Sequence, residues 1–152
     1  MLRFEVIELK KKDISKIVII DDESDILYTI KEICMHGGWE VATASNGKQG
    51  YELCKIHKPN LAIVDYHMPD WDGLTTVKRI RQLDNDLSIL VLTVDERQEI
   101  ADKFITAGAT DFAIKPFKSL ACNTTSPVLV LKLVTPPATP PVVFQLTPSH
   151  TY

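Results

Sequence analysis

Leu61-Ala62-Ile63-Val64-Asp65-Tyr66-His67-Met68-Pro69-Asp70-Trp71-Asp72-Gly73 is the segment around which the sequence is organised. Its four leading apolar residues, two of them β-branched, predict a short buried strand. The strand runs directly into a carboxylate, and a Met-Pro pair and an Asp-Gly turn signal follow. In open α/β sheets, ligands gather outside the carboxyl ends of the strands. Asp65 is therefore a candidate site residue by its position as well as by its chemistry.

The composition is that of one ordinary globular domain. The chain has 152 residues, of which 45% are hydrophobic and 24% charged, and its formal net charge is −3. This balance does not favour direct binding to nucleic acid or to an anionic membrane. The N-terminus lacks the apolar core of a signal peptide and no apolar run reaches membrane-spanning length, so we expect a cytoplasmic protein. The three cysteines are widely spaced and suggest neither a disulfide framework nor a metal clip.

Strand and helix patterns alternate five times along the chain. Apolar or alternating runs predict strands at residues 16–20, 39–44, 61–65, 87–93 and 110–114. Helical spacing predicts helices over residues 24–36, 47–58, 73–83 and 95–107, with Asn46 and Asp72 near two of their starts. Short connections between such elements are typical of an α/β fold, a doubly wound parallel sheet covered on both faces. We expect the flavodoxin-like strand order 2-1-3-4-5.

This topology brings polar residues from four strand ends to one crevice. They are Asp21 and Asp22 after the first strand, Asp65 after the third, Thr93 after the fourth and Lys115 after the fifth. Three gathered carboxylates repel one another unless a cation lies among them. Carboxylate oxygens are hard ligands that suit Mg²⁺, and the lysine and hydroxyl are donors for a phosphoryl oxygen.

These residues resemble the receiver domain of two-component response regulators, the CheY-like family. The resemblance covers residues 16–117 and rests on motifs that stand in the family's order: Asp21-Asp22, Asp65 with Met68-Pro69 and Gly73, Thr93, Phe112 and Lys115-Pro116-Phe117. It implies that the protein is a signalling module that accepts a phosphoryl group, and that it is not an enzyme that turns over a separate substrate. It also implies that a histidine kinase or a histidine phosphotransfer protein donates the phosphoryl group.

The resemblance assigns a role to each matching position. Asp65 is the residue expected to be phosphorylated, and Thr93 and Lys115 are expected to bind phosphoryl oxygens. Thr93 and Phe112 are the expected conformational switch. The Mg²⁺ ligands implied are Asp22, Asp65 and the backbone carbonyl of His67 directly, and Asp21 through a water molecule.

The C-terminal part of the chain departs from the family's pattern. The last acidic residue is Asp111, and six of the nine prolines follow Asn123. We therefore divide the chain into an N-terminal arm (1–15), a receiver domain (16–118) and a Pro/Thr-rich tail (119–152), with a fifth helix atypical or missing. Three interpretations stay open: Val128–Val134 docks where that helix would lie, the tail mediates dimerisation or binds an output partner, or it is a degenerate end.

Two other functions are alternatives. A phosphorylation-independent interaction domain is favoured if Val94, a branched residue next to Thr93, and the altered tail disable the switch. A phosphatase that forms an aspartyl phosphate would need a second aspartate two residues after Asp65, where this chain has His67. No helix-turn-helix pattern or basic stripe follows Phe117, so we expect no direct DNA binding.

Overall fold

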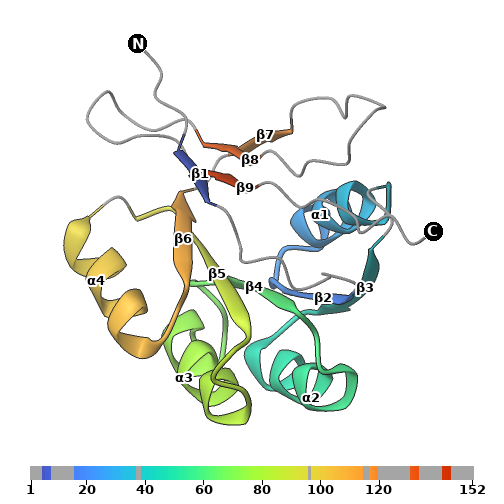
Figure 1. Ribbon diagram of the computed structural model, residues 1–152, viewed down its shortest axis with the longest axis horizontal. Coiled ribbons are helices and arrows are strands. Elements are labelled where there is room, and N and C mark those ends of the chain that lie inside the picture. The colour runs from blue at the N-terminus through green and yellow to red at the C-terminus, as the bar shows by residue number, and fades with distance from the viewer. Residues whose placement is uncertain are drawn as a thin grey trace.

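Five parallel strands form the central sheet of the computed structural model, which describes residues 5–7, 16–36, 39–95, 97–114, 117–119, 131–133 and 142–144. They lie in the order β3-β2-β4-β5-β6 (Figure 1). Their bounds are β2 (Lys16–Ile20), β3 (Glu40–Ala44), β4 (Leu61–Asp65), β5 (Ser88–Thr93) and β6 (Asp111–Ile114). Numbered along the predicted strands, this order is 2-1-3-4-5, so the predicted flavodoxin-like topology is confirmed.

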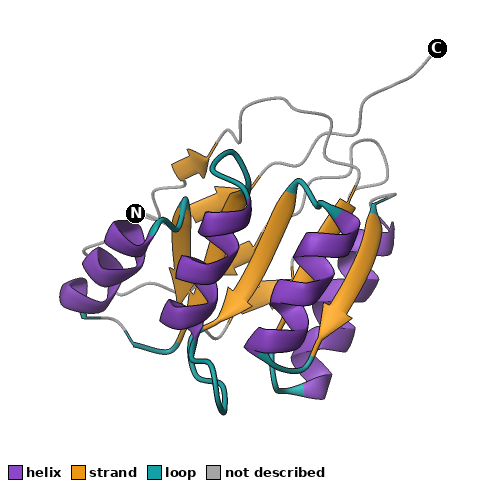
Figure 2. Ribbon diagram, turned by 90° about the horizontal axis from the view of Figure 1, so that it is seen from below, coloured by secondary structure: helices purple, strands orange, loops and turns teal. Residues whose placement is uncertain are grey.

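The helices cover the sheet on both faces. They are α1 (Ser24–His36), α2 (Gly47–His57), α3 (Gly73–Leu83) and α4 (Gln98–Ala107). Helix α1 lies on one face, and α2, α3 and α4 lie on the other (Figure 1). Figure 2 shows helices standing in front of the strands on the face turned toward the viewer. Since both faces of the sheet are covered, its strands can be apolar throughout, as in the LAIV run before Asp65.

Side-chain caps fix where α2 and α3 begin. The Asn46 carboxamide oxygen accepts the Gln49 N–H at 2.8 Å, and the Asp72 carboxylate accepts the Thr75 N–H at 2.8 Å. Each satisfies a backbone donor that the first helical turn leaves without a partner. Helix α4 begins three residues later than predicted, because the Asp95 carboxylate accepts the Arg97 N–H at 3.0 Å and Arg97 has an extended backbone conformation.

Short strands from both ends of the chain form two further pairs. Strand β1 (Glu5–Ile7) pairs in parallel with β9 (Val142–Phe144), and β7 (Phe117–Ser119) pairs antiparallel with β8 (Leu131–Leu133). Strand β8 falls inside Val128–Val134, the segment named above as one that could dock in place of the fifth helix. Figure 1 draws these four strands on the side of the sheet where α1 lies. No helix follows α4 in the parts of the chain that the structure describes.

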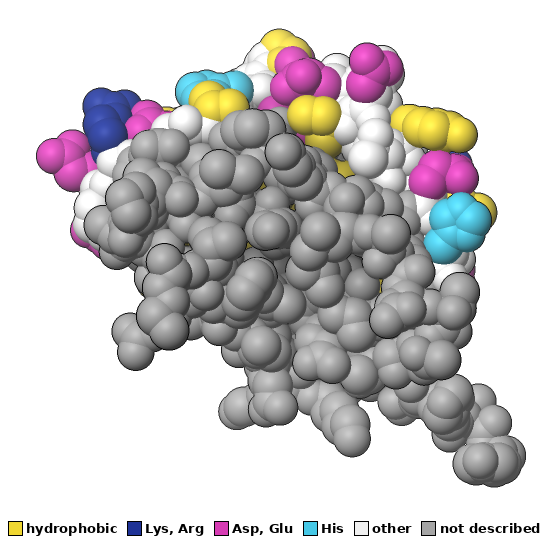
Figure 3. Space-filling view, turned by 90° about the horizontal axis from the view of Figure 1, so that it is seen from above, with side chains coloured by type: hydrophobic (Ala, Val, Ile, Leu, Met, Phe, Trp, Pro, Cys, Tyr) yellow, Lys and Arg dark blue, Asp and Glu magenta, His cyan; other side chains and the backbone are white. Residues whose placement is uncertain are grey.

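The rim of described residues that is visible in Figure 3 carries mixed side chains. Along the edge visible in Figure 3, acidic side chains alternate with apolar ones and with histidines, and no continuous basic patch is seen among the coloured residues. Among the described residues, no helix is long and apolar enough to cross a membrane.

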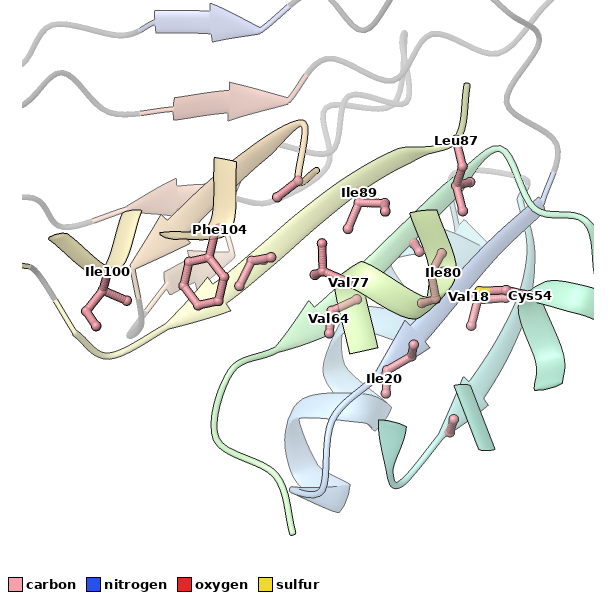
Figure 4. Packing of buried hydrophobic residues seen from close by; sticks show 14 residues of the cluster. Val18, Ile20, Cys54, Val64, Val77, Ile80, Leu87, Ile89, Ile100 and Phe104 are labelled. Atoms are coloured by element: carbon pink, nitrogen blue, oxygen red, sulfur yellow. The ribbon is translucent and has the colours of Figure 1, made fainter. Parts of the chain in front are cut away.

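Two apolar clusters fill the space between sheet and helices. Alternate residues of each strand contribute to opposite clusters, so Ile17 packs with Ile30 of α1 while Val18 packs with Cys54 of α2. Figure 4 shows the second cluster, in which Val77 and Ile80 of α3 and Ile100 and Phe104 of α4 point toward the sheet. Phe104 is the largest of the fully buried side chains.

The buried cysteines allow a chemical test of this packing. Burial raises the pKa of the Cys34 and Cys54 thiols to about 12 from a usual value of 9.0. Because the thiolate is the reactive form, we expect iodoacetamide at about pH 8 to alkylate both residues about 1,000-fold more slowly in the native protein than in urea. Peptide mapping by mass spectrometry measures each site separately. Equal rates in the two states would contradict the packing.

Candidate functional site

Three aspartates meet at the carboxyl edge of the sheet. Asp21 directly follows β2, Asp22 is next, and Asp65 is the last residue of β4. One carboxylate oxygen from each lies within 4.8 Å of the other two. Asp21 and Asp65 are 0% and 3% exposed, whereas Asp22 is exposed. The cluster is therefore open to solvent at Asp22, whereas Asp21 and Asp65 are enclosed by protein.

Neighbouring strands place the two buried carboxylates. β2 and β4 pair directly, with Ile20 opposite Val64, so the residues that follow them emerge side by side. The backbone N–H of Asp21 continues the ladder by donating to the Ala44 carbonyl at 3.1 Å. The Asp21 carboxylate accepts the Glu23 N–H at 2.9 Å, just before α1 begins. Its direction is thus set by the start of that helix.

The loop after Asp65 folds back onto the strand end. The Gly73 N–H donates to the Tyr66 carbonyl at 2.8 Å. A Cβ atom on Gly73 would lie 2.5 Å from the Asp65 carbonyl oxygen and 2.6 Å from the Tyr66 Cα, so a larger residue does not fit without movement of backbone. This close approach fixes the backbone on which the Asp65 carboxylate is carried.

Thr93 occupies the corresponding end of β5, the next strand along. It is 1% exposed, and its hydroxyl oxygen accepts the Asp95 N–H at 3.0 Å. The Asp95 carboxylate in turn binds the Arg97 guanidinium, with contacts of 2.9, 3.1 and 2.6 Å. Hydrogen bonds from this guanidinium lower the pKa of Asp95 to about 2, so that carboxylate is ionised at neutral pH.

Aromatic rings flank the site beyond the aspartates. The Tyr66 ring packs edge-on against Phe104 with centroids 4.9 Å apart, and its other neighbour is the His67 ring at 4.5 Å. Phe112 of β6 is half-buried and packs against the second core cluster. These contacts join the loop after β4 to the face of α4.

The structure brings the three predicted aspartates together. Asp21, Asp22 and Asp65 form one cluster, and Thr93 lies at the end of the strand that pairs with β4. Lys115 lies outside the described residues. Arg97 was not singled out in the sequence, although an acidic residue two positions before an arginine at a strand-to-helix turn is the signal that could have indicated the pair.

The donor set of the cluster is that of a hard divalent cation. Carboxylate oxygens are the protein ligands typical of Mg²⁺, which also keeps several waters. An exposed carboxylate beside two buried ones leaves a route by which a hydrated ion and a phosphorylated donor can approach. The arrangement therefore fits Mg²⁺ and suits phosphoryl transfer to a carboxylate.

Comparison with known proteins agrees with this geometry. Residues 17–122 match the model of the response regulator receiver domain. The chemotaxis protein CheY of Bacillus subtilis is 39% identical over 105 residues, which cover 68% of this chain and 88% of CheY. The transcriptional regulatory protein PrrA of Mycobacterium tuberculosis is 33% identical over 104 residues, which cover 67% of this chain and 44% of PrrA.

A solved structure supports the same assignment. CheY4 of Vibrio cholerae superposes with a TM-score of 0.66 at 27% identity, and the match covers 69% of this chain and 89% of that one. Sequence match, fold and the placement of the aspartates agree: the chain belongs to the family of response regulator receiver domains, which are signalling modules of two-component systems.

Proposed function

We propose that the Asp65 carboxylate accepts a phosphoryl group from a phosphohistidine of a histidine kinase or of a histidine phosphotransfer protein. The observation that carries the proposal is the cluster of Asp21, Asp22 and Asp65 within 4.8 Å at the carboxyl edge of the sheet. Response regulators receive phosphoryl groups from histidine kinases, and this chain matches their receiver domain over residues 17–122.

In the proposed step, an Asp65 carboxylate oxygen attacks the phosphorus atom in line. A new O–P bond forms while the N–P bond of the phosphohistidine breaks, and the imidazole nitrogen keeps the electron pair. Asp65 suits this role because strand pairing and the Gly73 contact fix its backbone. Positioning of this kind supplies much of the catalysis in phosphoryl transfer.

Asp21, Asp22, Asp65 and the backbone carbonyl of His67 would hold Mg²⁺. Bound there, the ion would offset the negative charge on the transferred phosphoryl oxygens. Asp21 contributes a carboxylate already oriented by the Glu23 N–H, and Asp22 contributes an exposed one. The three carboxylates lie close enough for one cation to bridge them.

Thr93, Lys115 and Phe112 would convert phosphorylation into a conformational change. The Thr93 hydroxyl and the Lys115 ammonium would each donate a hydrogen bond to a phosphoryl oxygen. Phe112 is half-buried, so its ring would bury more apolar surface by turning inward as Thr93 moves. The result would be a population shift that an output partner recognises.

Acetyl phosphate with Mg²⁺ tests the proposal without requiring the cognate kinase. We expect intact-mass spectrometry to show the addition of one phosphoryl group, and EDTA to prevent it. The adduct should be released by hydroxylamine, which cleaves acyl phosphates and leaves phosphoserine and phosphothreonine intact. Absence of any adduct on the folded protein would contradict the proposal, whereas steady hydrolysis of a small phosphate ester would indicate a phosphatase.

A further inference from the structure

A chain of hydrogen bonds joins the Thr93 hydroxyl to the start of α4. The Asp95 N–H donates to Thr93 Oγ1 at 3.0 Å. The Asp95 carboxylate accepts the Arg97 N–H at 3.0 Å as well as the guanidinium of the same residue. Arg97 therefore binds Asp95 through both its backbone N–H and its side chain.

Arg97 is also the N-cap residue of α4. Its carbonyl accepts the Ile100 N–H at 3.0 Å and the Ala101 N–H at 3.4 Å, and its own side chain makes no cap bond to the helix. A cation is unfavourable at a helix N-terminus, where the macrodipole favours negative charge. The Asp95 carboxylate offsets that effect, so the arginine is held at this position by its partner.

The guanidinium binds the carboxylate through two nitrogens. Nε lies 2.9 and 3.1 Å from the two carboxylate oxygens, and Nη2 lies 2.6 Å from Oδ2. Such fork-shaped pairs fix orientation better than a single contact. The Arg97 side chain is nonetheless 69% exposed, so the free energy of the pair is modest.

We propose that the Asp95–Arg97 pair is a latch that holds Asp95, and with it the Thr93 hydroxyl, in the arrangement of the unphosphorylated domain. The inference rests on the proposed role of Thr93 and Asp65. A threonine hydroxyl that moves to a phosphoryl oxygen carries Asp95 with it or gives up the Asp95 N–H. The first movement draws Asp95 away from Arg97, and the second takes the acceptor from an Asp95 N–H that the pair holds in place. The pair opposes both movements, so Arg97 is a positioning residue that sets how readily Thr93 moves.

The latch predicts that loss of Arg97 favours the phosphorylated-like state. Beryllium fluoride mimics a phosphoryl group on a carboxylate, and its binding with Mg²⁺ can be titrated calorimetrically. We expect Arg97→Ala to bind it about threefold to fivefold more tightly than the wild type, the range set by an exposed ion pair of good geometry. Arg97→Lys, which keeps the charge and loses the fork, should lie between them.

A matched control removes a positive charge from α4, which begins directly after Arg97. Lys103 is exposed on α4 and makes no contact with Asp95 among the described interactions, so Lys103→Ala should leave the affinity unchanged. Hydrogen exchange of the Asp95 amide in the free protein gives a second readout, which we expect to rise in Arg97→Ala by about the same factor. A purely structural role in α4 would change the melting temperature without tightening binding.

The outcomes separate the two proposals. If the wild type binds beryllium fluoride and Arg97→Ala binds it equally or more weakly, the latch is wrong and the phosphoacceptor proposal stands. If the wild type does not bind it at all, the phosphoacceptor proposal fails and the latch fails with it. Tighter binding by Arg97→Ala, together with unchanged binding by Lys103→Ala, supports both.

Discussion

Replacing Asp65 by asparagine is expected to abolish the phosphoryl adduct completely. The amide has neither the negative charge nor the nucleophilic oxygen that attacks phosphorus, and it removes one of the three carboxylates that would hold Mg²⁺. Asparagine has nearly the same size as aspartate, so the packing beside Gly73 is preserved. Intact-mass spectrometry after incubation with acetyl phosphate and Mg²⁺ measures the result, and circular dichroism verifies that the variant is folded.

Asp70→Asn is the control for this experiment. Asp70 lies in the same loop, is exposed, and has a φ of 65°, a conformation that asparagine adopts readily. Its replacement removes the same charge at a distance of a few residues, and phosphorylation should continue at the wild-type rate. An adduct that persists in Asp65→Asn would place the phosphoryl group on another residue and would overturn the assignment of Asp65.

Hydrophobic patterning predicted most of the core fold. The strand predicted at residues 16–20 matches β2 at both ends, because an unbroken apolar run ends at charged residues. Asn46 and Asp72 cap α2 and α3, as their side chains and positions suggested. The start of α4 was predicted too early, because periodicity does not reveal that the Asp95 carboxylate competes with the helix for the Arg97 N–H.

The predicted topology was enough to place the aspartates together, but it could not predict the ion pair near them or the pairing of the terminal strands. Asp21 and Asp65 could be brought together because parallel strands in the predicted order end at the same edge. The Asp95–Arg97 pair lies between β5 and α4, where hydrophobic periodicity carries no information and only the spacing of the two charged residues could have indicated it. The pairing of β1 with β9 was also beyond prediction, since three-residue strands from opposite ends of a chain depend on tertiary context.

Replacing Phe104 by alanine is expected to lower the free energy of unfolding by about 3–5 kcal/mol, the usual cost of truncating a buried phenylalanine. Phe104 is 0% exposed, lies among the apolar residues between α4 and the sheet (Figure 4), and packs edge-on against Tyr66. Neighbouring side chains cannot collapse fully into the space, so packing contacts are lost as well as hydrophobic burial. Urea unfolding followed by circular dichroism measures the change.

The adjacent residue provides the contrast for Phe104. Ile105 is 48% exposed on the same helix, and alanine has the higher helix propensity, so Ile105→Ala should change the free energy of unfolding by less than about 1 kcal/mol. If Phe104→Ala does not fold, Phe104→Leu retains most of the buried volume and should show a smaller loss. Equal effects of Phe104→Ala and Ile105→Ala would contradict the packing of α4 on the sheet. Because Tyr66 follows Asp65 in sequence, its contact with Phe104 joins this part of the core to the loop beside the proposed phosphorylation site.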